Sequence, residues 1–136
     1  MSRGRAAAAG AAATLVWAAV EPLDKRLFRL DYSDVAMLGK LVTRSRLWPA
    51  AGLAVHAANG AVFGVAWREL DRRRGTGPLA LALAENTALF AFAPAIDRFH
   101  PARGERGLAP LFSARGFAQS TFRHAVFGIV LARLAR

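Results

Sequence analysis

Four long apolar stretches, separated by short charged ones, dominate this sequence. They run over residues 6–23, 47–67, 78–96 and 116–134. A helix that crosses the hydrocarbon core of a bilayer needs about 20 mostly apolar residues, and each stretch is close to that length. Trp48 and Trp67 bracket the second stretch, in the positions that interfacial aromatic residues take. The pattern therefore predicts four transmembrane helices.

Helices buried in a soluble bundle are the alternative for these stretches. Such helices carry a polar stripe that recurs every three or four residues, and the first three stretches lack one. The fourth has the weakest membrane pattern, because Arg115, Gln119, Arg123 and His124 interrupt it. The first stretch has a second alternative, since "SRGR" before an alanine-rich apolar run also resembles a signal peptide.

The segment 34–44, between the first two stretches, has one apolar side and one polar side. Ser33 is a suitable N-cap, and Asp34 suits the positive end of a helix dipole. We therefore expect a short amphipathic helix that lies at the membrane interface. Its apolar side consists of Val35, Leu38, Leu41 and Val42.

The two halves of the chain share short phrases in the same order. "EPLDKRLF" at 21–28 is similar to "APAIDRF" at 93–99, and "AVFG" at 61–64 recurs at 125–128. An Ala-, Arg- and Phe-rich vocabulary could produce such echoes by coincidence, and that alternative stays open. As an internal repeat, the phrases predict an all-α, polytopic membrane protein. We expect residues 1–136 to form one transmembrane domain, a four-helix bundle made of two tandem helical hairpins.

Small residues recur every four positions in the second and fourth stretches. Positions four apart share a helix face, and small residues on one face let two helices approach closely in lipid. We therefore expect helix-packing seams, each of which also contains a histidine. The packing glycines are Gly52, Gly60, Gly64, Gly116 and Gly128.

Several polar residues fall inside the predicted spans. A charged side chain at mid-bilayer costs about 2.5–3.5 kcal/mol on the milder insertion scales, so these groups should point inward. Counted from the helix ends, they form two layers, with His56, Arg123 and His124 in one and Asn59, Glu85 and Asn86 in the other. Such a polar core either locks the arrangement of the helices or forms a proton path, an ion path or a ligand pocket.

Three functions follow from this core. The first is a structural or accessory membrane protein, and the second is a small proton-coupled transporter or channel that uses Glu85. The third is a b-type haem protein with His56 and His124 as axial ligands. The sequence contains no H-x-x-x-H, G-x-S-x-G, P-loop or Rossmann pattern. We therefore expect no enzyme, no metal site and, apart from that haem alternative, no cofactor.

Charge and composition favour a membrane over nucleic acid. The formal net charge is +10 and 54% of the residues are hydrophobic. The basic residues cluster between the apolar stretches, which is the pattern of membrane-protein loops rather than of a nucleic-acid surface. We expect the lipid bilayer as partner, with a homodimer or another membrane protein as a further option. Because there is no cysteine, disulfides and thiolate chemistry are excluded.

The expected location is the bacterial inner (plasma) membrane, with several spans. The short arginine-rich connection at 68–74 favours cytoplasmic termini. The bias is weak, however, since the loops 24–46 and 98–123 also carry many basic residues, and it leaves room for an antiparallel homodimer. The phrase "HxxNGxxFG" at 56–64 and the overall composition resemble small four-helix integral membrane proteins of GC-rich actinobacteria. This resemblance implies a membrane bundle but no particular activity.

Overall fold

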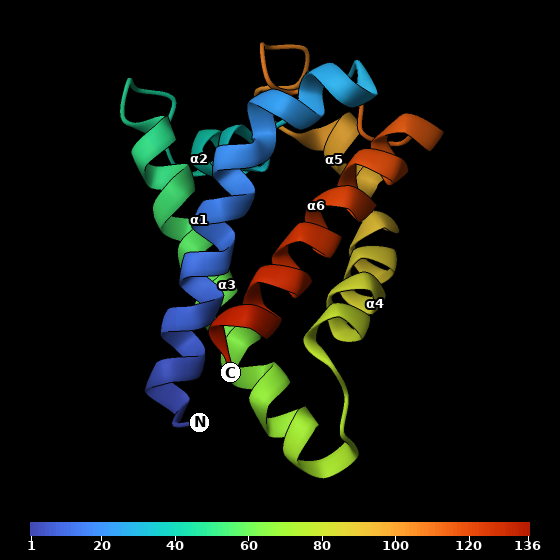
Figure 1. Ribbon diagram of the computed structural model, residues 1–136. Coiled ribbons are helices and arrows are strands. Elements are labelled where there is room, and N and C mark those ends of the chain that lie inside the picture. Colours follow the sequence, from blue (N-terminus) through green and yellow to red (C-terminus); the bar gives the residue numbers. More distant parts are fainter.

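The computed structural model describes all 136 residues and contains six helices and no strands. The expected all-α class is therefore confirmed. The helices, labelled in Figure 1, are α1 (Arg3–Phe28), α2 (Asp34–Val42), α3 (Trp48–Arg74), α4 (Pro78–Phe90), α5 (Ala93–Phe99) and α6 (Ala114–Leu134).

The long helices run between two ends of the molecule. Both termini and the connection between α3 and α4 lie at the lower end in Figure 1, whereas α2 and α5 lie at the upper end. Among the four long helices, the most extensive contacts join α1 to α3 and α4 to α6, and contacts between α1 and α6 connect these two pairs, while α2 packs on α3. In contrast, α3 and α4 touch at few residues. The helices are therefore packed in the order α3, α1, α6, α4.

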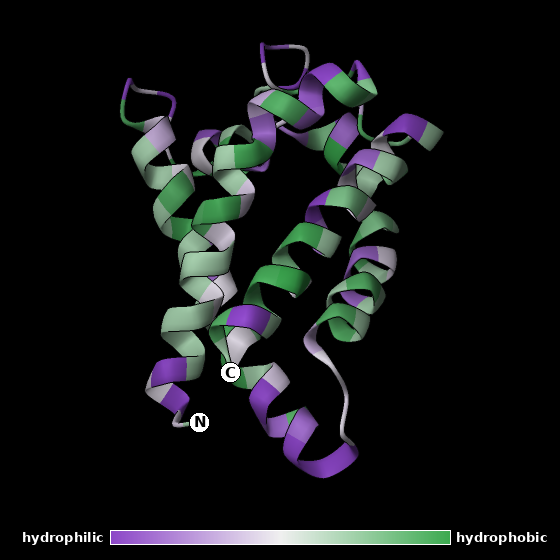
Figure 2. Cartoon of the chain, viewed as in Figure 1, coloured by the Kyte–Doolittle hydropathy of each residue, from purple (hydrophilic) through white to green (hydrophobic).

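Two helices, α1 and α3, are each long and apolar enough to cross a membrane. A third span arises if α4 and α5 are taken together, although their axes differ by 47°. Figure 2 shows apolar residues along the middle of the long helices and hydrophilic residues at both ends. The predicted fourth span, α6, is not among the candidates. Its polar residues Gln119, Arg123 and His124 are buried against the other helices.

Two prolines affect the helix boundaries in opposite ways. The first helix continues through Pro22 to Phe28, beyond the predicted end of its span at residue 23. A proline removes one backbone hydrogen bond from a helix, and here the helix tolerates the loss. In the third stretch, by contrast, helical structure breaks at residues 91–92, and Pro94 lies in the first turn of α5. Proline is favoured at that position and disfavours helix before it, so residues 78–96 do not form one straight helix.

The upper end is closed by a contact between two loops. Tyr32 and Leu108 form an isolated antiparallel bridge. Beside it, Ser33 N–H donates to the Gly107 carbonyl at 2.8 Å, and Ala109 N–H donates to the Asp31 carbonyl at 3.0 Å. Ser33 also accepts from Ala36 N–H and caps α2 as predicted. The loop before α2 is thus hydrogen-bonded to the loop that leads towards α6.

The glycines on α3 and α6 lie at close backbone contacts. A Cβ at Gly60 would overlap the Thr14 hydroxyl, and one at Gly64 would overlap the Ala6 carbonyl of α1. Gly52 faces the Val35 carbonyl of α2 in the same way, and Gly128 faces the Leu79 backbone of α4. Gly116 differs, because it packs on Leu111 in the loop before its own helix. Four of the five glycines therefore lie at contacts between helices.

The two "AVFG" phrases occupy corresponding places in the two helix pairs. Gly64 packs on the first turns of α1, and Gly128 packs on the first turn of α4. The phenylalanines before these glycines, Phe63 and Phe127, contact each other edge to face with ring centroids 4.9 Å apart. The echo in the sequence therefore corresponds to two similar packing sites that meet at the centre of the molecule.

Candidate functional site

A buried ion cluster surrounds Arg123 of α6, whose side chain is only 2% exposed. Its Nε and Nη2 atoms each donate to an oxygen of Asp24 at 2.6 Å. Nη2 also donates to the Tyr32 carbonyl at 2.8 Å, and Nη1 donates to Asp34 Oδ2 at 2.7 Å. Nη1 lies 3.8 Å from Glu21 Oε1 as well. The guanidinium is thus paired with three carboxylates and one carbonyl.

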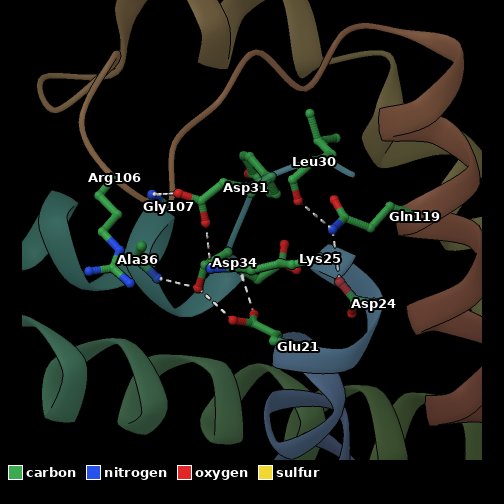
Figure 3. A network of polar contacts seen from close by, with 12 residues as sticks. Glu21, Asp24, Lys25, Leu30, Asp31, Asp34, Ala36, Arg106, Gly107 and Gln119 are labelled. Atoms are coloured by element: carbon green, nitrogen blue, oxygen red, sulfur yellow. Dashed lines mark hydrogen bonds and ion pairs between the residues drawn. The ribbon is translucent and has the colours of Figure 1, made fainter. Parts of the chain in front are cut away.

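The carboxylates of Glu21 and Asp24 face Arg123 because α1 is unbroken at Pro22. Residues three apart in a helix share a face, so the continuous helix presents both side chains to α6. Asp24 is fully buried and also accepts from Gln119 Nε2 at 2.8 Å. Figure 3 shows Gln119 between Asp24 and Leu30, whose carbonyl accepts a second bond from Nε2 at 3.1 Å. The end of α1 is thereby fixed to α6.

Glu21 connects α1 to the start of α2. Its Oε2 accepts from the Ser33 hydroxyl at 2.6 Å and its Oε1 from Asp34 N–H at 3.0 Å (Figure 3). Asp34 in turn pairs with Arg123. Burial is the largest single influence and acts to raise the pKa of Asp34. The charge and hydrogen bond of Arg123, together with the nearby His56 and His124, outweigh it and hold this pKa below the usual value. Asp34 is therefore ionised in the folded protein.

Asp31 lies just outside the cluster and joins the two loops of the upper end. Lys25 Nζ lies 2.9 Å from its Oδ1, and Gly107 N–H donates to its Oδ2 at 2.9 Å (Figure 3). The hydrogen bond from Lys25 is the main reason that the pKa of Asp31 lies below its ordinary value. This carboxylate therefore contributes to holding the loop around Gly107 against the end of α1.

The two histidines predicted to lie in the core both contact Trp17 of α1. The indole ring lies 4.9 Å from the imidazole of His56 and 4.6 Å from that of His124, centroid to centroid. His124 Nδ1 lies 2.8 Å from the Ser120 carbonyl, whereas His56 Nε2 and Trp17 Nε1 are buried without a hydrogen-bond partner. The structure thus brings His56 and His124 together at Trp17, and His124 follows Arg123, the centre of the ion cluster, directly on α6.

The other predicted core residues are divided among different environments. Asn86 is buried, and it donates to Thr121 and accepts from Ser120, both of α6. Glu85 forms no hydrogen bond, and its side chain is 40% exposed with His124 Nε2 at 4.0 Å. Asn59 is exposed and also forms no hydrogen bond. The expected lower layer of three inward polar groups is therefore not assembled, because Asn59 is exposed and Glu85 is partly exposed, whereas Asn86 alone is buried.

No group of three or more His, Asp or Glu side chains is arranged to hold a metal ion. The haem alternative also finds no support in the geometry, since the indole of Trp17 fills the space beside both imidazoles. A porphyrin between His56 and His124 would have to displace it.

Two cavities open at the ends of the molecule. One, of about 350 Å³, lies at the upper end and is lined by Tyr32, Asp97 and His100 among others. The other, of about 410 Å³, lies at the lower end beside Trp67 and Arg68. Neither cavity is lined by a residue of the predicted polar core. No charged side chain of the ion cluster therefore lines either opening, although Tyr32, whose carbonyl binds Arg123, borders the upper one.

The sequence indicated Arg123 as an inward-facing charge but not its main partners. Glu21 falls in the last turn of the predicted span and Asp24 directly after it, where acidic residues are typical of helix ends, and Asp34 was assigned to the dipole of α2. One signal in the sequence could have indicated these partners. Glu21 and Asp24 are three residues apart, so they share a face if the helix continues beyond Pro22.

No family model, curated protein or solved structure matches the chain. Its function has therefore to be inferred from the site itself.

Proposed function

We propose that this protein is a multi-pass integral protein of the bacterial inner (plasma) membrane with a structural or accessory role. In this proposal α1 with α3 and α4 with α6 form the two hairpins of a four-helix bundle. The apolar faces of these helices contact lipid, and α2 lies along the interface. Leu41 and Val42, both exposed on α2, support that placement because a membrane surface would cover them. The role is non-catalytic.

The nearly complete pairing of Arg123 is the observation that supports a structural role. A group that binds a substrate or relays an ion must be left open to it, whereas four of the five N–H groups of Arg123 are already bonded within the protein. The partners come from α1, α2 and the loop between them. Arg123 therefore joins the first half of the chain to α6, and the cluster fixes how the two helix pairs meet.

Replacement of Arg123 by methionine tests this role. Removal of one partner from a buried ion pair leaves an uncompensated charge and costs about 3–5 kcal/mol. We expect R123M to lower the thermal unfolding midpoint of the detergent-purified protein strongly and to reduce its amount in the membrane. R115M is the matched control, since Arg115 is on the same helix but exposed and unpaired.

The double variant R123M/D24N distinguishes a paired charge from simple loss of packing. The double variant removes the guanidinium and also neutralises the Asp24 carboxylate, which is the main partner of Arg123. We therefore expect the double variant to unfold at a higher temperature than R123M. An unfolding midpoint of R123M equal to that of R115M would contradict the proposal.

Proton-coupled transport through Glu85 is the second candidate function. One observation favours it, namely that this carboxylate is partly exposed halfway along α4 with no hydrogen bond and only a histidine nearby. Such a group is free to bind a proton or a cation.

A further inference from the structure

Glu85 and His124 face each other across the contact between α4 and α6, away from the ion cluster. We propose that this pair is an intramembrane site that binds either one proton or one lipophilic organic cation, in competition. The proposal deepens the second candidate function and does not depend on the structural role of Arg123. It rests on the hydrogen bonding of His124, on the charges around Glu85 and on the side from which Glu85 is reached.

The hydrogen bond of His124 determines which of its nitrogens exchanges a proton. Nδ1 lies 2.8 Å from the Ser120 carbonyl, which can only accept. Nδ1 therefore carries a hydrogen in every protonation state, and Nε2 is the atom that gains or loses one. Nε2 is also the nitrogen directed at Glu85, at 4.0 Å from Oε2. A single proton can thus reside on Nε2 or on the Glu85 carboxyl.

Both positions of this proton leave the pair without net charge. With the proton on Nε2 the pair is an imidazolium and a carboxylate, and with the proton on Oε2 it is a neutral imidazole and a carboxylic acid. Once the proton leaves, an anionic Glu85 remains in apolar surroundings, which is unfavourable. Loss of the proton therefore requires another positive charge.

Apart from His124, no titratable group of the protein lies within ion-pair distance of Glu85, so none supplies that charge by direct contact. The neighbouring titratable and charged groups are His56 on α3, Asp34 on α2 and Arg123 on α6, while α1 contributes the uncharged Trp17. Arg123 is bonded to Asp24 and Asp34 and cannot turn towards Glu85. The replacement for the proton must therefore be a cation from outside the chain.

The exposure of Glu85 indicates how such a cation arrives. Neither cavity at the ends of the molecule is lined by Glu85, whereas its side chain is 40% exposed on the side of the molecule. Glu85 lies about 10 Å along α4 from Pro78, at a rise of about 1.5 Å per residue, and is therefore well away from the end of the helix. Because α4 touches α3 at few residues, α3 does little to cover α4. A hydrated inorganic ion does not enter hydrocarbon, so the ligand is a cation with delocalised charge and apolar substituents.

Tetraphenylphosphonium is a suitable probe for the purified protein in lipid nanodiscs. We expect the wild type to bind it, to release one proton per bound cation into weakly buffered solution, and to gain up to about tenfold in affinity per pH unit while the proton competes. E85Q should lose both binding and proton release. E69Q, which changes a partly exposed glutamate at the lower end of α3 that pairs with Arg3 and Arg68, should retain both.

H124N separates a shared proton from a proton held by Glu85 alone. The asparagine amide can still donate to the Ser120 carbonyl, but it has no equivalent of Nε2. Because the proton then has one position in place of two, it binds more weakly, and the pH at which the cation binds half-maximally should fall below that of the wild type. A structural role of His124 would not move this pH.

Several results would overturn the site. They are equal tetraphenylphosphonium binding by the wild type and E85Q, the absence of binding by the wild type, binding without proton release, and an H124N midpoint equal to that of the wild type. Proton release driven by Na⁺ alone would show that a hydrated ion reaches Glu85, and would overturn the inference that the cation arrives through the lipid. Thermal unfolding shows whether E85Q is folded, and if it is not, the midpoint of H124N decides. Loss of the site would leave the effect of R123M unchanged, so the two proposals fail separately.

Discussion

At the scale of single residues, the buried charges of this protein differ in how completely they are bonded. Arg123 and Asp24 have almost no exposed surface, and their polar atoms meet oppositely charged partners. Glu85 has no hydrogen bond at all and keeps two fifths of its surface. Since a half-satisfied buried charge is costlier than a fully paired one, the first arrangement suits a permanent contact, whereas the second suits a group whose partner changes.

Acid should weaken the folded protein through the carboxylates at its upper end. The pKa values of Asp34 and Asp31 both lie below their ordinary value, so the unfolded chain takes up protons before the folded protein does. The stability that they contribute is fully present above about pH 4 and is lost as the pH falls through the lowered pKa values. Asp31 is about half exposed, so solvent screening reduces its share and Asp34 dominates.

A series of thermal unfolding measurements from pH 6 down to pH 3 checks this dependence. We expect the wild-type midpoint to fall over the lower part of the series and that of D34N to start lower and to fall less. D71N is the control, because Asp71 is exposed and has no ion pair. Equal acid dependence of the wild type and D34N would contradict the assignment to Asp34.

The sequence predicts that Arg123 faces inward, but not which residues pair with it. That Arg123 must avoid lipid follows from the cost of an exposed charge in hydrocarbon. Its partners do not follow, because they lie some 90 to 100 positions earlier in the chain and depend on whether α1 ends at Pro22. A proline favours a helix end without requiring one. The partners Asp24 and Asp34 therefore became clear only with the positions of α1 and α2.

At the scale of helices, the glycine seam between α1 and α3 sets the distance between their backbones. Gly10 of α1 faces the Gly60 carbonyl, and Gly64 of α3 faces the Ala6 carbonyl. In lipid, where the hydrophobic effect does not drive helices together, such close van der Waals contact is the main source of packing energy. The four-residue spacing of small residues was sufficient to locate this seam in the sequence. Such a spacing defines one face of a single helix, so the partner helix need not be known.

G64A tests the seam. Its Cβ would overlap a backbone carbonyl that cannot rotate away, so we expect a destabilisation of about 1–3 kcal/mol in unfolding by a denaturing detergent. G4A is the control, since Gly4 lies in α1 with open space around it and alanine is about 0.5–1 kcal/mol better than glycine inside a helix. If G64A were as stable as the wild type, close packing at this point would be refuted.

Which side of a helix faces its neighbours was less predictable than where the helix lies. Each of the six helices overlaps a stretch or segment that the hydrophobic pattern marks, but α1 extends beyond its stretch at both ends and α3 continues seven residues past its predicted end. Asn59 nevertheless faces outward, although its position inside an apolar stretch suggested the core. Helix faces depend on the positions of several partners at once, and in α6 polar residues face the protein while apolar residues such as Ile129 are exposed. This inversion is expected for a helix in lipid rather than in water.

At the scale of the whole molecule, the charged residues gather at two ends separated by an apolar middle (Figure 2). The lower end holds both termini and the arginine-rich end of α3, and the upper end holds the bonded loops (Figure 1). For a protein that crosses the membrane, these two ends lie on opposite sides of it.

Single cysteines can report the side on which each end lies, because the chain has none of its own. We expect R73C, at the lower end, to react with a membrane-impermeant maleimide only after inner-membrane vesicles are inverted. R46C, at the upper end, should react from the outside of intact cells with a permeable outer membrane. Reaction of both variants from the same side would contradict a transmembrane arrangement, and both reacting from both sides would indicate dual orientation.

The division of the ion cluster between the two halves of the chain has a consequence for biosynthesis. The first half supplies Glu21, Asp24 and Asp34, and the second half supplies Arg123. When α1, α2 and α3 have left the ribosome, these acidic groups have no guanidinium, and the loop at 31–33 lacks its neighbours at 107–109. Arg123 lies some 90 to 100 positions further along the chain and is made after all of them. The nascent protein thus completes its charge balance only when α6 is inserted, and a chain truncated before that point exposes unmatched carboxylates that membrane quality control can recognise.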